Sequence, residues 1–170
     1  MAKIDLTTAL EGKPRPHYLV GEAEYSFENG AHRLVATAVF PSSRDSIGDR
    51  AKAPVPHANV GDAYFAIWNA VHIISEMAGV CGTLTGEGQF RASRPIPPDT
   101  PLRLEVVLDN IRDSGRHVCS DYKGVYSLDN RKLLEISGKG VGRKIKEPSP
   151  VQSGTSEPDG FSCCYGFRES

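Results

Sequence analysis

The segment VPHANVGDAYFAIWNAVHIISEMAG, residues 55 to 79, is the longest apolar stretch in this chain of 170 residues. Apolar side chains recur in it at helical spacing from residue 60 to residue 78. Three aromatic side chains widen the apolar surface beyond one stripe: Tyr64, Phe65 and Trp68. A helix that is apolar on most sides is a buried helix. We therefore predict one long central helix over residues 60–78.

Strand-like alternation lies on both sides of this helix. Before it, residues 18–27 and 32–40 alternate at period two, and the Asn29-Gly30 pair between them is a strong hairpin signal. A polar loop follows at residues 41–56. Four further strands are expected after the helix, at residues 83–96, 102–111, 116–128 and 132–145.

This order of elements predicts an α+β fold with the hotdog architecture, in which a curled antiparallel sheet of about six strands wraps around one long central helix. The alternative is a cystatin-like roll, which usually places its helix before most of the sheet. We expect an N-terminal segment at residues 1–16, the hotdog domain at 17–146 and a disordered tail at 147–170. The tail is low in apolar residues and rich in Pro, Ser and Gly.

Charge and composition argue against several classes of protein, among them nucleic-acid-binding, membrane-associated and metal-binding proteins. Lys and Arg total 20 and Asp and Glu total 21, which gives a formal net charge of -1. A nucleic-acid or anionic-membrane partner normally demands a clustered basic surplus, so neither is expected. Nothing resembles a signal peptide or a membrane span, and we expect a cytoplasmic protein. The four cysteines have no metal-site spacing, so we predict no metal and no catalytic thiol.

Polar side chains share one side of the predicted helix. At about 100° per residue, four of them fall within roughly 80° of one another; they are Asp62, Asn69, His72 and Glu76. The arc has two explanations: a solvent-facing strip, or a functional site. Solvent exposure explains Asn69 least well, because Trp68 and Ala70 flank it.

The start of the helix suggests what such a site would do. His57, Asn59 and Asp62 lie where backbone N–H groups have no partner and the helix dipole is positive. Asn59 or Asp62 could be an N-cap only. The alternative is a thioester site, in which N–H groups and Asn amides polarise the carbonyl oxygen and a carboxylate or His moves a proton. We expect substrate contacts from the adjoining helix residues Tyr64, Phe65, Trp68 and His72.

These residues resemble a known family. HAN at 57–59, then Asp62, then WNA at 68–70 is similar to the pattern of the FcoT-like family, hotdog-fold type III fatty acyl-CoA thioesterases, and YLVGEAEYS at 18–26 is similar to their first strand. The resemblance implies acyl-thioester substrates, an acyl tunnel and no cofactor. Relatives in isonitrile lipopeptide pathways act on acyl groups attached to acyl carrier proteins.

The resemblance places the family's two Asn residues at Asn59 and Asn69, the second with one extra helix residue between them, and its acidic residue at Asp62. His57 lies two residues before Asn59. A Tyr expected in the preceding loop is Ala51 here. Because of that departure, a dehydratase, an isomerase or another reaction on the same thioester stays open as an alternative to hydrolysis.

Three functions therefore stay open. The leading hypothesis is hydrolysis of acyl-CoA or acyl-carrier-protein thioesters, with Asn59, Asn69, Asp62 and His57 in the catalytic site. The second is a 3-hydroxyacyl dehydratase or a related lyase or isomerase that uses His57 and Asp62. The third is a non-catalytic acyl-binding module. Because the sheet would leave exposed edges, we also predict a homodimer or a dimer-based oligomer.

Overall fold

The computed structural model describes residues 1–13, 16–43, 57–81, 88–115 and 117–144. Its helices and strands follow in this order: β1 (Ala2–Asp5), α1 (Leu6–Ala9), β2 (Leu19–Glu28), β3 (Ala31–Ala38), α3 (Val60–Met77), β4 (Val80–Cys81), β5 (Gly88–Ala92), β6 (Leu102–Asp113), β7 (Val118–Leu128) and β8 (Arg131–Lys144). The predicted loop at 41–56 falls mostly outside the described residues, and the predicted tail at 147–170 falls wholly outside them.

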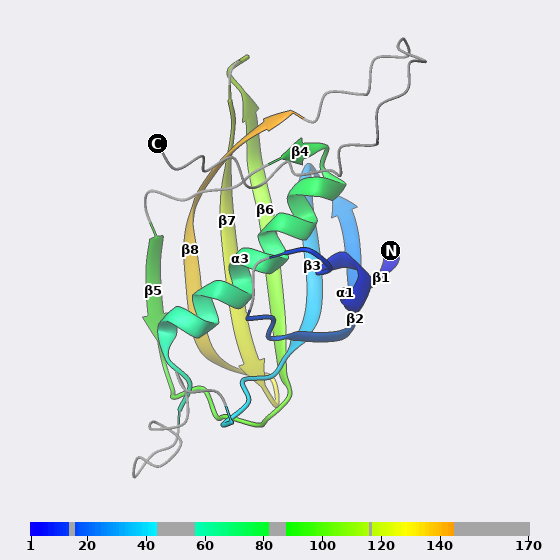
Figure 1. Cartoon of the computed structure of the whole chain (residues 1–170). Helices are drawn as coiled ribbons and strands as arrows, with labels where there is room; N and C mark the ends of the chain where they lie inside the picture. Colours follow the sequence, from blue (N-terminus) through cyan, green and yellow to red (C-terminus); the bar gives the residue numbers. More distant parts are fainter. Residues whose placement is uncertain (14–15, 44–56, 82–87, 116, 145–170) are drawn as a thin grey trace, which may run out of the picture.

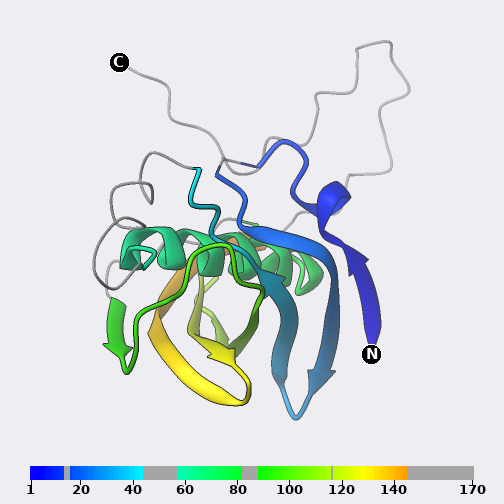
Figure 2. The same cartoon turned by 90° about the horizontal axis from the view of Figure 1, so that it is seen from below.

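The strands form one curled antiparallel sheet. Neighbours run in the order β1-β2-β3-β6-β7-β8, and β8 also pairs with both β4 and β5. Figure 1 shows α3 lying across this sheet, and Figure 2 shows the sheet curling around it. The predicted architecture of a curled sheet around one long helix is confirmed. The sheet has eight strands rather than about six, because the short β1 and β4 join its ends.

Hairpin chemistry sets the register of the long strands. Asn29 and Gly30 have φ values of 52° and 78° between β2 and β3, and Asp129 and Asn130 have 49° and 61° between β7 and β8. A two-residue turn with φ above zero at both positions has the twist that antiparallel strands need. The predicted Asn-Gly hairpin is confirmed, and its register places Phe27 opposite His32.

The core lies between α3 and the concave face of the sheet. Alternate residues of β6 point inward and are almost fully buried: Leu102, Leu104, Val106 and Leu108. Ile67 of α3 lies directly over Gly124 of β7, where an added Cβ would come within 2.5 Å of the Ile67 Cδ1 atom. The missing side chain of Gly124 thus lets the helix approach the sheet closely.

The N-terminal segment is joined to the sheet. Strand β1 pairs with β2 from Ala2 opposite Tyr25 to Asp5 opposite Glu22. Asp5 caps α1 by accepting a hydrogen bond from the Thr7 N–H at 3.0 Å. The short helix inserts Leu6 and Leu10 into the core, where they are 1% and 3% exposed. Residues 1–13 therefore add buried apolar side chains to the core.

None of the described helices is long and apolar enough to span a bilayer.

Candidate functional site

The N-terminus of α3 carries the first of the predicted site residues. Asn59 is the N-cap, with extended backbone at φ -81° and ψ 159°, and its Oδ1 accepts a hydrogen bond from the Asp62 N–H at 2.8 Å. The N-cap role considered for Asn59 is thus observed. Gly61 fits beneath this cap, because a Cβ there would lie 2.9 Å from Asn59 Oδ1. The cap and the glycine together keep the first turn compact.

Backbone donors are available at this helix end. The first N–H groups of an α-helix have no acceptor within the helix. Asn59 accepts hydrogen bonds from two of these N–H groups. Its side-chain oxygen accepts from the Asp62 N–H, and its backbone carbonyl accepts from the Ala63 N–H at 3.2 Å. Within the described residues, the N–H groups of Val60 and Gly61 are left for a ligand, and both residues are exposed. The dipole of the 18-residue helix adds positive potential there.

Asp62 has a buried partner that the sequence analysis did not assign to the site. The Tyr18 hydroxyl donates a hydrogen bond to Asp62 Oδ1. Tyr18 is fully buried and packs on Phe40 with ring centroids 4.9 Å apart, and Asp62 is 8% exposed. This contact holds the carboxylate in one orientation. The strand pattern gave no signal for it, because Tyr18 precedes β2 and alternation gives no reason to bury both Tyr18 and Leu19.

His57 lies just before the helix. It is half-buried, and the next residue, Ala58, forms an isolated antiparallel bridge with Ile96. In this bridge the Ala58 N–H donates a hydrogen bond to the Ile96 carbonyl at 2.9 Å. The hydrogen bond fixes the position of the chain just before α3 begins. His57 and Asn59 are thus both placed at the same end of the helix, with Asp62 in the first turn.

Residues that precede β2 contact the polar arc of α3. Along the helix, Asp62 accepts from Tyr18, Asn69 donates from Nδ2 to the Pro16 carbonyl at 3.5 Å, and Glu76 forms an ion pair with Lys13. Successive contacts on the helix are seven residues apart, which is about two turns. Solvent exposure of the arc is therefore wrong for Asp62, Asn69 and His72, which are 8%, 0% and 4% exposed, while Glu76 is exposed.

His72 lies in the same arc in an environment that favours the neutral ring. Burial and, to a smaller extent, the nearby Lys13 ammonium lower its pKa to about 4, and the Glu76 carboxylate partly opposes this shift. Its ring contacts Trp68 edge to face, with centroids 4.7 Å apart. A neutral imidazole here can accept or donate a hydrogen bond at physiological pH without carrying charge.

The aromatic residues assigned to substrate binding lie on the least buried side of the helix. Tyr64, Phe65 and Trp68 are all half-buried. Phe65 and Trp68 meet edge to face, with centroids 5.1 Å apart. They form an apolar surface next to the exposed first turn.

Helix geometry separates the predicted catalytic residues into two groups. His57, Asn59 and Asp62 lie at the N-terminus. Asn69 is ten residues beyond Asn59, which corresponds to a rise of about 15 Å. One carbonyl oxygen cannot contact both amides across that span, although a longer ligand lying along the helix can.

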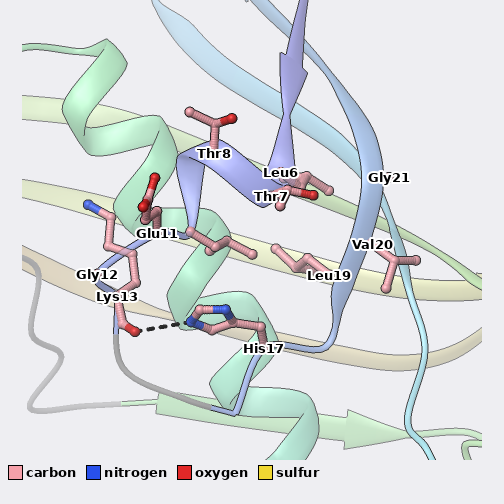
Figure 3. Close-up of a pocket in the computed structure, with 11 residues that line it drawn as sticks. Leu6, Thr7, Thr8, Glu11, Gly12, Lys13, His17, Leu19, Val20 and Gly21 are labelled. Carbon is pink, nitrogen blue, oxygen red and sulfur yellow. Dashed lines mark hydrogen bonds between the residues drawn. The ribbon is translucent and has the colours of Figure 1, made fainter.

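A separate pocket of about 750 Å³ opens between α1 and the start of β2. Figure 3 shows Glu11 and Lys13 on one side of it and Leu19 and Val20 on the other. The His17 ring is fixed against the Lys13 carbonyl, with Nε2 and the carbonyl oxygen 3.1 Å apart. None of the predicted site residues lines this pocket. Within the described residues, no cluster of His, Cys, Asp and Glu could hold a metal ion.

Comparison with solved structures identifies the fold. The structure of yhdA from Lactococcus lactis, named as a candidate thioesterase, superposes with a TM-score of 0.52 at 10% identity, covering 73% of this chain and 91% of that one. This chain has the hotdog fold. At such low identity the likeness concerns the fold alone. No family model matches the sequence, and no curated protein matches it significantly.

Two further structures superpose less closely with this hotdog chain. One is smu.793 from Streptococcus mutans bound to acetyl CoA, with a TM-score of 0.49, 12% identity and coverage of 74% of this chain and 91% of that one. The other is a hypothetical thioesterase from Streptococcus pneumoniae with coenzyme A, with a TM-score of 0.48, 11% identity and coverage of 72% and 86%. The fold assignment rests on the first comparison.

Proposed function

We propose that this hotdog protein is an acyl-thioester hydrolase related to the FcoT-like enzymes, acting on acyl-CoA or on acyl groups attached to a carrier protein. The observation that carries the proposal is the buried Asp62 carboxylate, which Tyr18 orients and which lies in the same first helical turn as the exposed residues Val60 and Gly61. The hotdog fold and the family-like spacing of His57, Asn59 and Asp62 support it.

The reaction needs an electrophilic carbonyl and an activated water. The thioester carbonyl oxygen accepts hydrogen bonds from the Val60 and Gly61 N–H groups, whose strength grows as negative charge develops on the oxygen. The Asn59 side-chain NH₂ adds a third donor, because its Oδ1 is already used by the cap. Asp62 takes a proton from water as the water oxygen attacks the carbonyl carbon. The C–S bond then breaks and the proton on Asp62 passes to the leaving sulfur, which gives a carboxylic acid and a free thiol and restores the Asp62 carboxylate.

The test is thiol release. Purified protein would be incubated with straight-chain acyl-CoAs and with the same acyl groups on an acyl carrier protein, and free thiol and products would be followed. Thiol release that falls about 100-fold or more in Asp62→Asn supports the proposal. The matched control is Asp109→Asn, which changes a carboxylate on the opposite face of the sheet. Loss or addition of water without thiol release would instead identify a lyase, and binding without turnover would identify an acyl-binding module.

We also propose a homodimer formed through β5. All five residues of this strand are exposed, Phe90 is 62% exposed, and among the described strands β5 pairs only with β8. An unpaired strand edge with an exposed aromatic residue is a template for pairing with a second copy. Light scattering should give twice the chain mass at micromolar concentration. The Phe90→Lys variant should give a mass closer to that of the monomer. A wild-type monomer would contradict this assembly.

A further inference from the structure

The pocket between α1 and the start of β2 is open to small molecules. Its volume of about 750 Å³ is typical of a small-molecule site. Its lining includes three nearly buried leucines, which are Leu6, Leu10 and Leu19. Other lining residues are exposed, among them Thr7, Glu11 and Val20. A molecule in solution can therefore reach this pocket without any change in the fold.

A β-bulge in β2 forms one wall of the pocket. The regular pairing of β2 with β3 is interrupted between Val20 and Glu24. Gly21 lies in this interruption with a φ of 72°, and no atom lies within 4 Å of the place where its Cβ would be. A bulge bends its strand and often lies next to a functional site. Here it leaves open space beside Val20, which is 42% exposed.

The hydrogen-bond donors around the pocket already have acceptors. The Lys13 ammonium forms an ion pair with Glu76. The Thr8 hydroxyl donates to the Asp5 carboxylate at 2.9 Å, and the backbone N–H of Glu11 donates to the Thr8 carbonyl at 3.1 Å. An anion would therefore find no free ammonium group among the described residues that line the pocket.

Two acceptors in the same pocket remain available. In the part of the chain that the structure describes, the Glu11 carboxylate has no ion pair and no hydrogen bond. The His17 Nε2 atom lies 3.1 Å from the Lys13 carbonyl oxygen, and because that oxygen can only accept, Nε2 carries the hydrogen. In the neutral ring, His17 Nδ1 then keeps a lone pair. Both side chains line the pocket (Figure 3).

We propose that this pocket binds a small primary amine as its ammonium ion, with Glu11 and His17 as the acceptors. An ammonium group has a positive charge and three N–H donors, which complement a carboxylate and an imidazole lone pair. Val20 offers exposed apolar surface to a short hydrocarbon group on the amine. No residue assigned to the thioester site lines the pocket. The inference is therefore independent of the proposed function.

The test is an NMR titration of the full chain with three probes that share a hexyl group: hexylammonium, hexyltrimethylammonium and heptanoate. Hexylammonium should give saturable shifts of the Glu11, Gly12 and Val20 amide signals. Hexyltrimethylammonium has the same charge but no N–H donor, so it should bind about tenfold more weakly. Heptanoate should bind least, because the Glu11 carboxylate repels it.

Three variants connect the binding to these side chains. Glu11→Gln removes the charge at an exposed position and should weaken hexylammonium binding about tenfold. His17→Phe keeps a ring but removes the acceptor, and it should also weaken binding. The matched control is Glu28→Gln, which removes a carboxylate at the exposed end of β2, outside the pocket. It should leave the affinity unchanged.

Other results overturn the inference. Equal affinities for hexylammonium and heptanoate would show that the pocket does not distinguish charge. Shifts that rise without saturation would show contact with the surface only. Equal losses of affinity in Glu11→Gln and Glu28→Gln would show general attraction to a negative surface and no site at Glu11. Because none of these readouts uses thiol release, a failure of the proposed hydrolysis would leave the amine result standing.

Discussion

The face of α3 that meets the sheet and the arc that meets the residues preceding β2 are held by different chemistry. On the sheet side, Ile67 fits over Gly124 and the contacts are apolar. On the other side, Tyr18 and Lys13 bond Asp62 and Glu76. Apolar packing depends on shape, whereas the polar arc depends on paired donors and acceptors. The first face fixes the helix in the fold, and the second holds polar side chains in set orientations.

The polar arc should make the protein sensitive to acid through His72. Its pKa is about 4 in the folded protein, against about 6.5 for an unfolded chain. Between these values the unfolded chain binds a proton that the folded protein does not, so stability falls as the pH falls from 6.5 towards 4. The expected loss is on the order of 3 kcal/mol.

Urea unfolding from pH 7 to pH 4 measures this effect. His72→Gln keeps a polar side chain that does not titrate, so its stability should fall less over the same range. The charged neighbours Lys13 and Glu76 stay in place in both proteins and serve as the internal control. Parallel pH profiles for the two proteins would show that His72 does not carry the acid sensitivity.

The apolar face should be sensitive to volume instead. Gly124→Ala places a Cβ within 2.5 Å of Ile67 Cδ1, and Ile67 is 1% exposed and has little room to move. Overpacking of this kind costs about 1–3 kcal/mol. Adding Ile67→Val removes the clashing Cδ1 methyl and should restore part of the loss, which a double-mutant cycle measures.

Gly88→Ala is the control for that cycle. Its nearest neighbour would be Tyr122 Oη at 3.5 Å, an ordinary contact. It should therefore change the melting temperature much less than Gly124→Ala. Equal losses for the two variants would argue that backbone freedom, and not the contact with Ile67, explains the glycine.

The smallest effect should come from the ion pair at the end of the arc. Lys13→Met breaks the contact with Glu76, whose side chain is 43% exposed, so the stability loss should be at most about 1 kcal/mol. Because the Lys13 ammonium lowers the pKa of His72, the same change should raise that pKa in an NMR titration. Lys3→Met, at the exposed pair with Glu22, should leave the His72 titration unchanged.

The sequence predicted the apolar face better than the polar one. The spacing of Ile67, Ala70 and Ile74 gives the helix, and the alternation in β6 gives the strands, because burial on one side imposes a period. What covers the polar arc could not be predicted in this way. The contacts with Lys13, Pro16 and Tyr18 join residues 44 to 63 positions apart, and no local period records such pairs.

The short elements at the edges were missed for a related reason. Strands β1 and β4 have four and two residues, and helix α1 has four. Segments of that length carry too few side chains to show a period. Their place is set by partners far along the sequence, such as the pairing of β4 with Lys144 and Arg143 of β8.

One measurement tests most directly whether the polar arc is a catalytic device: thiol release and melting temperature for Asp62→Asn, recorded together. Asparagine can still accept the Tyr18 hydrogen bond, so the fold should be kept and the melting temperature should change by only a few degrees. Thiol release from acyl-CoA should fall about 100-fold or more, because the proton acceptor is gone. A variant that melts several degrees earlier yet releases thiol at the wild-type rate would contradict the account and leave Asp62 as a structural partner of Tyr18.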